Sequence, residues 1–265
     1  MPRSIWNGTV TFGLVNVPVK LYTATESKTV SFHELHAKDE ARIEHKRVCP
    51  KEDKEVPYKE VVKGYEVAPD EYVVLSKEEV AAADPPRGKV IEIEQFVPDD
   101  QIDPVYFDKT YYVGARGDEA SDAYKVLHAA LKKSERVGIG RFVFHNAEQL
   151  VALRPLDGVL ALHKMRVHDE VVGGDELDVP KPQKKPAERE VEMAGNLVSS
   201  LEADFKPSKY KDTYRAAVQK LIERKAKGEE IEAPKEEEPE DDSGDLLKAL
   251  EASVKSGSGS GKKKR

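Results

Sequence analysis

The chain has 265 residues, of which 38% are hydrophobic and 35% are charged, and this polar balance predicts that part of it lies outside any packed core. No run approaches the roughly 20 apolar residues that span a bilayer, and the N-terminus has no apolar stretch of the signal-peptide type, so we expect a cytoplasmic protein without a membrane partner. Cys49 is the only cysteine, which excludes an intrachain disulfide and argues against a cysteine-ligated zinc site.

The net charge of −7 is unevenly distributed. Residues 228–251 hold eleven acidic and two basic residues, a local charge of −9, so the rest of the chain carries +2. Residues 105–168 hold ten Lys and Arg against seven Asp and Glu, together with four histidines. Affinity for nucleic acid depends on where cations lie near phosphates rather than on the charge of the whole chain. The acidic total therefore does not exclude a nucleic-acid partner, although +3 over 105–168 is weak evidence for one.

The first half of the chain has the pattern of short β-strands. Val10, Phe12 and Leu14 alternate with polar or small residues, and from Val15 the alternation shifts phase, which predicts a bulge or tight turn near 13–16. Further alternating or β-rich runs cover 88–97, 110–113, 137–144, 150–154 and 158–168. So many short strands, with few helices between them, predict an antiparallel barrel or sandwich.

Three segments have helical periodicity. Residues 121–133 place apolar side chains along one face, with Ser121 as the expected N-cap. The Pro- and charge-rich segment 180–190 is expected to be a linker. A second helix is expected beyond it, with a face made of Leu197, Val198, Leu201 and Phe205. A third helix is expected between a cap at Asp212 and a stop at Gly228, with a face made of Tyr214, Val218, Leu221, Ile222 and Lys225.

The C-terminal region is predicted to be largely unpacked. Residues 229–245 are acidic, contain Pro and lack apolar periodicity, which indicates a flexible linker. An amphipathic stripe returns at 245–255 and consists of Leu246, Leu247, Leu250 and Val254. An isolated helix this short is marginal in water, so packing on the protein's own core and folding on a partner are both open on pattern alone. Its position beyond the acidic linker favours a tethered partner-binding helix, followed by an SGSGSG spacer and a basic KKKR tip.

The sequence contains no constellation typical of an enzyme. The HELH at 33–36 lacks the HExxH spacing of a zinc protease, and His33, His36, His45 and Cys49 form no closed four-ligand pattern. There is no GxxxxGK[ST] loop, no GxGxxG opening a helix and no GxSxG elbow. We therefore expect no catalytic residues, no metal site and no cofactor.

One face of the strand predicted at 158–168 has basic side chains at its C-terminal end. Lys164 and Arg166 follow Leu162 on that face, and Arg141 interrupts another apolar run. Such a strand suits a surface that follows phosphates, and on composition alone a solvated sheet face is an equal alternative. No segment resembles a recognition helix rich in Arg, Asn and Gln, so a DNA-binding surface here would contact the backbone rather than base edges.

Long segments of the chain resemble the bacterial Ku family. They are SIWNGTVTFGLVNVPVKLYTATE (4–26), SFHELHAKDEARIEHKRVCP (31–50), VVKGYE (61–66), DPVYFDKTYYVG (103–114), RPLDGVLALHKMRVHDEV (154–171), MAGNLVSSLEADFKPSKYKDTYRAAVQKLIERK (193–225) and DLLKALEASVK (245–255). The similarity covers almost the whole chain in the family's order. Some relatives carry a CxxC where this chain has Cys49-Pro50-Lys51-Glu52, which puts any metal function there in doubt.

The resemblance implies an α+β, mainly β, protein with an antiparallel β-barrel core, an extended arm, a C-terminal helical arm and a flexible tail. It implies a ring-shaped homodimer that binds double-stranded DNA ends without reading sequence and has no catalytic activity. It also implies recruitment of an ATP-dependent end-joining DNA ligase in non-homologous end joining repair of double-strand breaks. The expected domains are 1–180 for the barrel and arm, 181–228 for the helical arm and 229–265 for the linker, short helix and tail. The expected location is cytoplasmic and nucleoid-associated.

The same resemblance assigns expected site residues. The DNA-lining set is Lys20, Lys28, Lys109, Arg116, Arg141, Arg154, Lys164 and Arg166, and the segment 98–120 is expected to form part of the arm. Leu246, Leu247, Leu250 and Val254 are expected to bind the partner. A general architectural DNA-binding protein that does not need ends is the main alternative. A DNA hydrolase would require a carboxylate or metal cluster that the sequence does not show.

Overall fold

The computed structural model describes residues 2–82, 88–145, 147–178 and 185–230 of the chain. It divides into two units, one made of residues 1–28 and 32–176 and the other of residues 29–31 and 177–265. The first unit contains a β-barrel, and the second contains the C-terminal helices.

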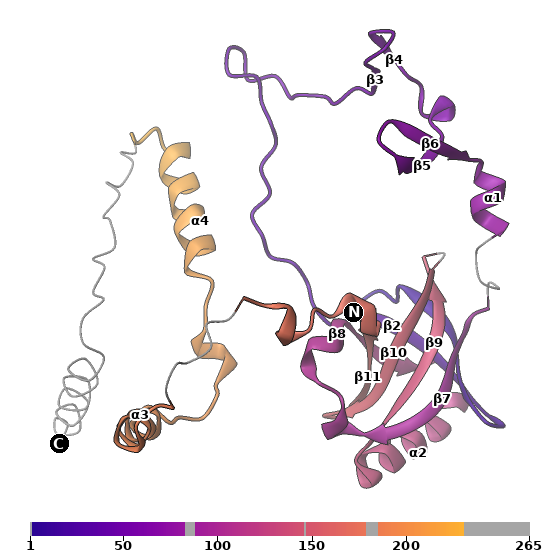
Figure 1. The fold of residues 1–265 in the computed structure, drawn as a ribbon, viewed down its shortest axis with the longest axis vertical. Helices are drawn as coiled ribbons and strands as arrows, with labels where there is room; N and C mark the ends of the chain where they lie inside the picture. Colours follow the sequence, from indigo (N-terminus) through magenta and orange to yellow (C-terminus); the bar gives the residue numbers. More distant parts are fainter. Residues whose placement is uncertain (1, 83–87, 146, 179–184, 231–265) are drawn as a thin grey trace. The chain divides into compact units, whose positions relative to one another are not determined.

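Seven strands of the first unit form a closed barrel in the order β1-β2-β8-β11-β10-β9-β7 (Figure 1). Their bounds are β1 Trp6–Phe12, β2 Val15–Thr23, β7 Val90–Pro98, β8 Phe107–Ala115, β9 Arg136–Phe144, β10 Ala147–Leu156 and β11 Val159–Met165. Each neighbouring pair is antiparallel except β1 and β7, which close the barrel in parallel. A parallel pair needs a long connection, and the chain between β2 and β7 supplies it. The predicted barrel is confirmed, with one parallel pair that strand alternation alone did not indicate.

A tight turn joins β1 to β2. Phe12 pairs with Val15, so the loop is two residues long, and Gly13 adopts a positive φ of 57° that favours glycine. The turn reverses the chain and brings Val10 opposite Val17, both of them fully buried inside the barrel. The predicted turn near 13–16 is therefore confirmed, and the phase shift in the sequence marks the change of strand.

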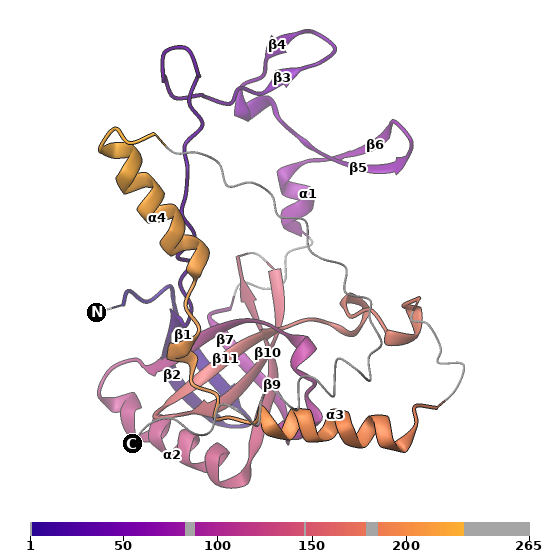
Figure 2. The same ribbon diagram turned by 90° about the vertical axis from the view of Figure 1, so that its left-hand side faces the viewer.

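Helix α2, Glu119–Ser134, lies across one end of the barrel (Figure 2). Its Leu127 and Leu131 are buried in the same apolar cluster as the strand side chains. The helix predicted at 121–133 is confirmed, but Ser121 is not its cap, since the helix begins two residues earlier. Ala120 is buried, and this packing extends the helix in the N-terminal direction beyond the residue that capping preference alone selects.

The segment 98–120 is not an arm, contrary to the expectation from the resemblance. It contains the short 3₁₀ turns η2, Asp99–Gln101, and η3, Pro104–Tyr106, then strand β8 of the barrel, and it ends in the first residues of α2. Asp103 accepts a hydrogen bond from the Val105 amide at 2.9 Å, which fixes the second turn. The Asp and Pro residues of this segment therefore lie in tight turns next to the barrel strands.

The long connection between β2 and β7 has an open structure. It contains strands β3 Val48–Cys49, β4 Lys54–Glu55, β5 Lys63–Ala68 and β6 Glu71–Leu75, with the turn η1 Tyr58–Glu60 and the short helix α1 Lys77–Ala82. The strands form two separate two-stranded sheets, β3 with β4 and β5 with β6. No residue between Leu21 and Ile91 whose burial is described is buried. These elements were not predicted from the sequence, and they are the extended part of this unit.

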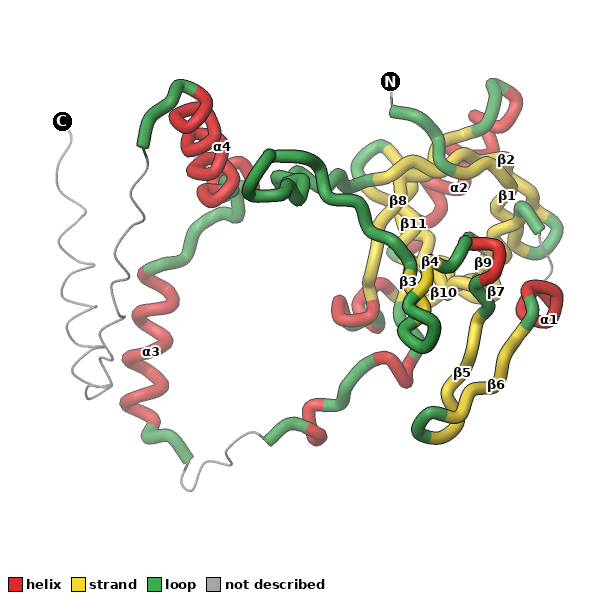
Figure 3. Tube along the Cα trace, turned by 90° about the horizontal axis from the view of Figure 1, so that it is seen from above, coloured by secondary structure: helices red, strands yellow, loops and turns green. Residues whose placement is uncertain are grey.

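The chain leaves the barrel after β11 through the turns η4 His168–Glu170 and η5 Gly174–Glu176. The strand predicted at 158–168 therefore ends at Met165, three residues early. In the second unit, Figure 3 shows α3, Glu188–Ser200, and α4, Thr213–Ala226, with the turn η6, Pro207–Lys209, between them. Because α3 starts at Glu188, the last residues of the predicted linker 180–190 are helical. Phe205, expected on the face of this helix, lies beyond its end.

The ends of α4 confirm the sequence prediction. The Asp212 carboxylate accepts a hydrogen bond from the Arg215 amide at 2.8 Å, and Gly228 takes a positive φ of 81° just past the helix. No residue described between 185 and 230 is buried. The predicted tail helix with Leu246, Leu247, Leu250 and Val254 lies outside the described residues. Among the helices that are described, none has the length and apolar character to cross a membrane.

Candidate nucleic-acid interface

Lys20 and Arg116 lie on the outer face of the barrel, where β2 pairs with β8. Val19 and Leu21 flank Lys20 in β2 and are fully buried, so strand alternation turns Lys20 outward. The Arg116 amide donates a hydrogen bond to the Pro18 carbonyl at 3.0 Å, which makes Arg116 a diagonal neighbour of Lys20 across the two strands. Neither side chain has a carboxylate partner within the described part of the chain. Both charges are therefore free to meet an anion.

Lys109 and Lys164 meet at the open end of the barrel, opposite the end that α2 covers. They are paired directly across β8 and β11, and each continues the inward-facing row of its strand. The Lys164 ammonium lies 3.0 Å from the Asp108 carboxylate, whereas the Lys109 ammonium lies 5.7 Å from the centre of the Tyr111 ring. The four side chains share a hollow of about 520 Å³ with Ile5, Thr23, Phe144, His145, Ala147 and Gln149.

Arg154 and Arg166 are occupied by groups of the protein itself. Arg154 forms an ion pair with Asp99 at 2.6 Å, and Arg166 donates hydrogen bonds to the carbonyls of Val105 at 2.9 Å and Phe107 at 2.7 Å. Since Asp99, Val105 and Phe107 belong to the turns before β8 or to its first residue, these bonds fasten the turns to β10 and to the end of β11. Their geometry indicates a structural role for both arginines, and a phosphate would have to compete with these partners.

Arg141 and Lys28 are also paired with carboxylates. The Arg141 guanidinium lies 2.9 Å from Glu148 and 3.2 Å from Glu94, and the hydrogen bond to Glu148 raises the pKa of the guanidinium. Lys28 pairs with Glu26, and that hydrogen bond lowers the pKa of the carboxyl group. Of the eight cations expected at DNA, Lys20, Lys109 and Arg116 are therefore those without a carboxylate partner in the described residues.

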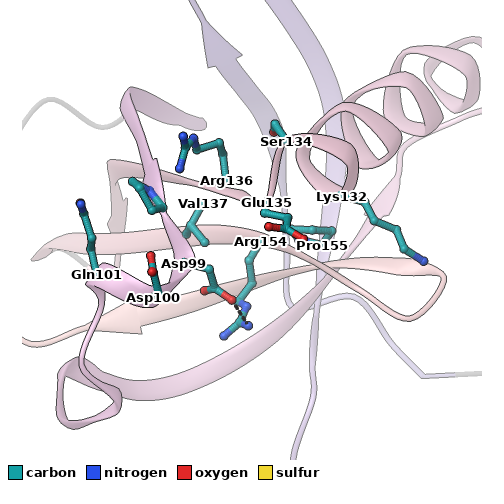
Figure 4. Close-up of a pocket in the computed structure, with 11 residues that line it drawn as sticks. Asp99, Asp100, Gln101, Lys132, Ser134, Glu135, Arg136, Val137, Arg154 and Pro155 are labelled. Atoms are coloured by element: carbon teal, nitrogen blue, oxygen red, sulfur yellow. Dashed lines mark hydrogen bonds and ion pairs between the residues drawn. The ribbon is translucent and has the colours of Figure 1, made fainter.

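A second hollow in the described residues is balanced in charge. It measures about 790 Å³ and lies between η2, the end of α2, the start of β9 and the end of β10. Lys132, Arg136 and Arg154 are its cations, and Asp99, Asp100 and Glu135 are its anions. In Figure 4 the Arg154 guanidinium reaches the Asp99 carboxylate, whereas Lys132 and Arg136 extend away from this pair. The balance gives no preference for a phosphate, so size alone does not make this hollow the DNA-binding site.

His163 is a half-buried imidazole among these cations. Its Nδ1 lies 2.9 Å from the Thr110 hydroxyl, and its ring packs on Phe107 with centroids 4.8 Å apart. Its Nε2 is buried and lacks a hydrogen-bond partner in the described structure. Burial, with a smaller contribution from Arg154, lowers the pKa of the imidazole below its ordinary value. A proton on Nε2 would create a buried donor without an acceptor, so the structure favours the neutral ring.

Sequence reasoning missed the exposed apolar side chains of the connection between β2 and β7. In the β5–β6 hairpin, Tyr65 pairs with Val73 on one face, while Tyr72 and Val74 lie on the other. All four are largely exposed, Tyr65 at 69%. The Pro69-Asp70 pair between two apolar runs, with Asp70 at a positive φ of 62°, was a usable turn signal for this hairpin. The hairpin therefore presents exposed apolar side chains on both of its faces, in addition to the cations on the barrel.

The candidate interface contains no arrangement for metal chemistry in the part of the chain that is described. No three His, Cys, Asp or Glu side chains there are grouped as metal ligands. Cys49 is a free thiol, and His36 and His45 pair with the carboxylates of Asp39 and Glu34. The described cations and apolar faces can bind an anion or another protein surface.

The structure defines a closed seven-stranded β-barrel protein with a long open connection between β2 and β7, and comparison with known families identifies the kind of barrel. The model of the Ku70/Ku80 beta-barrel domain matches residues 11–193, more than half of the chain. The chain belongs to the Ku family.

Similar curated proteins cover most of the chain. It is 45% identical over 255 residues to the non-homologous end joining protein Ku of Anaeromyxobacter sp. (strain K), covering 96% of this chain and 86% of that protein. It is 39% identical to the Ku protein of Mycolicibacterium smegmatis, with 97% and 83% covered, and 35% identical to that of Bacillus subtilis, with 95% and 81% covered. Among solved structures, the SPOC domain of human PHD-finger protein 3 aligns with 62% of this chain and 95% of its own, with 13% identity and a TM-score of 0.31.

Proposed function

We propose that this chain binds the ends of double-stranded DNA as a ring-shaped homodimer and does not read their sequence. In this role it protects the ends and recruits an ATP-dependent DNA ligase for non-homologous end joining. The observation that carries the proposal is the open connection between β2 and β7. Its described residues are unburied and rich in apolar side chains, as a segment that closes a ring with a second copy needs to be.

The names of the similar proteins support the process. The three proteins above are each called a non-homologous end joining protein Ku, and each is matched along most of its length. A repair complex of this kind works on broken duplexes, so the location we propose is the cytoplasmic nucleoid.

The β5–β6 hairpin supports the homodimer. A two-stranded hairpin is marginally stable by itself in water, and this one has apolar side chains on both faces. Burial of one such side chain stabilises an interface by about 1.5–3 kcal/mol. A second copy of the same surface, related by a twofold axis, would cover these side chains without requiring any other protein.

The outward cations support contact with the DNA backbone. Lys20 and Arg116 are adjacent on the outer face, and their charges are not neutralised by described carboxylates. Contacts of Lys and Arg with phosphates position a protein on a duplex and carry no sequence information directly. A ring that encloses the duplex holds it by topology and needs few such contacts.

The first test compares duplex DNA with and without free ends. A linear duplex, a closed circle of the same sequence and the linear duplex with streptavidin on both biotinylated ends compete for the full chain. We expect the linear duplex to bind at least about a hundredfold more tightly than the other two, because only a free end can enter a ring. The biotinylated duplex without streptavidin is the control. Equal affinity for the linear duplex and the closed circular duplex would instead identify an architectural DNA-binding protein.

The second test concerns the dimer. Replacing Tyr65 and Val73 by Ser removes two apolar side chains from one face of the hairpin, and we expect the dimer to dissociate at least about tenfold more readily. Native mass spectrometry over a range of concentrations measures this. Lys63→Ser, a change of an exposed polar side chain in the same hairpin, is the matched control. An unchanged dimer in the double variant would remove the hairpin from the interface.

The third test concerns the ligase. The proposed ligase-binding residues Leu246, Leu247, Leu250 and Val254 follow the acidic linker in sequence. A chain truncated after Gly228 is expected to keep its affinity for linear duplex and to lose stimulation of the ligase in an end-joining assay. Loss of the dimer on truncation would contradict this division of roles.

A further inference from the structure

The inward lysine pair at the open end of the barrel is not explained by the barrel's stability. Lys109 and Lys164 are directly opposite each other in the antiparallel pair of β8 and β11. Like charges in this position repel and destabilise the pair. Asp108 compensates Lys164 at 3.0 Å, but Lys109 has only the face of the Tyr111 ring at 5.7 Å. One anion placed between the two ammonium groups would remove this repulsion.

The hollow around the lysines is lined by hydrogen-bond donors. Lys109 and Lys164 contribute ammonium groups, Tyr111 a phenol, Thr23 a hydroxyl and Gln149 an amide. These side chains come from four strands, β8, β11, β2 and β10, and belong to their inward-facing rows. Asp108 is the only carboxylate that lines the hollow among the described residues. A rigid barrel therefore holds several donors around one small volume with a net positive charge.

The phenol of Tyr111 is suited to donate a hydrogen bond here. Only 4% of the residue is exposed, and burial raises the pKa of the phenol, with Lys164 opposing and Asp108 adding to this effect. The hydroxyl therefore remains protonated at neutral pH. Its residue lines the same hollow as the two lysines, and hydrogen bonds from a neutral hydroxyl and from ammonium groups are both suited to the oxygens of an oxyanion.

We propose that the open end of the barrel is a phosphate-binding site in which Lys109, Lys164 and Tyr111 hold the oxygens of a single phosphate group. The hollow measures about 520 Å³, which admits a phosphate and one attached sugar but is too small for a base-paired duplex. The phosphate belongs either to the 5′ end of a DNA strand or to a free phosphate compound. The first source rests on the proposed function, whereas the site itself does not.

The floor of the site favours a compact anion over an acidic peptide. Phe144 and the fully buried core behind it close the hollow on the inside, so an extended chain has no groove to follow. The acidic segment 229–242 of this protein is the peptide that would compete most readily, because it is tethered to the same chain. It is therefore included in the test as a synthetic competitor.

The experiment measures binding of small probes to the full-length protein by ³¹P NMR and calorimetry. The probes are inorganic phosphate, the dinucleotide pTpT with a 5′ phosphate, and TpT without one. We expect phosphate and pTpT to bind and TpT not to bind. K109Q/K164Q is expected to weaken phosphate binding at least about tenfold and Y111F about threefold, because each removes donors to a charged group. K109R/K164R, which keeps both charges, is expected to retain most of the binding.

The matched control is K125Q/K133Q, which removes two exposed lysines from α2 and should leave phosphate binding unchanged. Equal phosphate affinity in K109Q/K164Q and wild type would overturn the proposal, as would failure of wild type to bind phosphate or pTpT. The proposal would also be overturned if the 229–242 peptide bound more tightly than pTpT and this binding were lost in K109Q/K164Q, because the site would then be a peptide site. A circular-dichroism melt of each variant establishes that it is folded.

Two duplexes that differ only in their 5′ ends distinguish the sources. If wild type binds the 5′-phosphorylated duplex more tightly than the 5′-hydroxyl duplex, and K109Q/K164Q does not discriminate, the phosphate is that of a DNA end. If pTpT and phosphate bind but the duplexes are equivalent, the source is a free phosphate compound. The preference for linear over circular duplex is measured separately in K109Q/K164Q. If this preference persists in the variant, binding of DNA ends does not depend on the phosphate site, and the two proposals are tested independently.

Discussion

Removing the two free cations on the outer face of the barrel tests whether that face meets DNA phosphates. The change is K20Q/R116Q, and it alters exposed or half-exposed side chains without a carboxylate partner in the described structure. Each phosphate contact contributes about −0.9 to the slope of log K against log salt for B-form DNA. Two contacts per chain therefore contribute about −1.8, and a ring of two chains about −3.6.

The assay is fluorescence anisotropy of a labelled linear duplex at several salt concentrations between 50 and 200 mM. Over this fourfold range, the slope difference of about 3.6 expected for the proposed ring changes the relative affinity roughly a hundredfold, so the double variant should be much weaker than wild type at low salt and closer to it at high salt. The loss should be the same for duplexes of different sequence, because backbone contacts carry no base readout. A difference between the salt slopes of wild type and variant that is nearer 3.6 than 1.8 would also indicate that two copies of the chain bind each DNA.

Arg141 provides the control for this experiment. Its guanidinium is already paired with Glu148 and Glu94, so R141Q should change the slope by less than about 0.5. Parallel salt lines for K20Q/R116Q and wild type would refute the assignment of Lys20 and Arg116. A slope change in R141Q as large as in K20Q/R116Q would show that ion pairing in the free protein does not predict which cations meet DNA.

Three further changes test the barrel itself. The Tyr124 hydroxyl donates a hydrogen bond to the Val113 carbonyl at 2.6 Å and accepts one from the Leu160 amide at 2.7 Å. Tyr124→Phe leaves both backbone groups unpaired and should lower the free energy of unfolding, measured by urea melts, by about 2 kcal/mol. A loss below about 0.5 kcal/mol would contradict this prediction. Because the pKa of His163 is lowered in the folded protein, the unfolded chain binds a proton at this side chain first as the pH falls. The free energy of unfolding should therefore decrease as the pH falls below the ordinary histidine pKa of about 6.5. His163→Gln should flatten this part of the profile of stability against pH. A Cβ on Gly140 would lie 2.0 Å from the Glu92 carbonyl, so Gly140→Ala should destabilise the β7–β9 pair by roughly 1–3 kcal/mol, and a wild-type melting temperature would show that β7 gives way.

Alternation in the sequence was sufficient to predict most of the barrel. Val10, Val17 and Val19 are buried on the rows where the alternating pattern placed them. Of the helix predicted at 121–133, Leu127 and Leu131 pack on the barrel, whereas Val126 is 69% exposed. The pattern is reliable in β1, β2 and β8 because each of these strands has one buried and one more exposed face, which local sequence records directly. The parallel closure of β1 on β7 depends on the long connection between β2 and β7 and leaves no such local trace.

The site was predicted less well because charge pairing depends on register. The sequence identified Arg141, Arg154, Lys164 and Arg166 as basic residues on strands, and each has a carboxylate partner from another element. Glu94 is 47 positions from Arg141, and Asp99 is 55 positions from Arg154, so neither pairing is visible without the fold. Lys20 and Arg116 lack a carboxylate partner for an equally non-local reason, since Lys20 lies opposite Asn7 and Gly114 and the Arg116 amide bonds to the Pro18 carbonyl.

The extended arm was misplaced for a reason that bears on the proposed dimer. Segment 98–120 was expected in the arm, whereas β5 and β6 were not recognised, because they carry apolar residues on both faces and so match neither a half-buried strand nor a flexible loop. A strand pair with two apolar faces has no stable arrangement on one barrel surface, which can cover only one of them. A second copy can cover the other, and the closed ring that results would hold a duplex by enclosure. Of the eight cations expected at DNA, five are paired with described carboxylates, which is consistent with this mode of binding because an enclosed duplex needs few tight phosphate contacts.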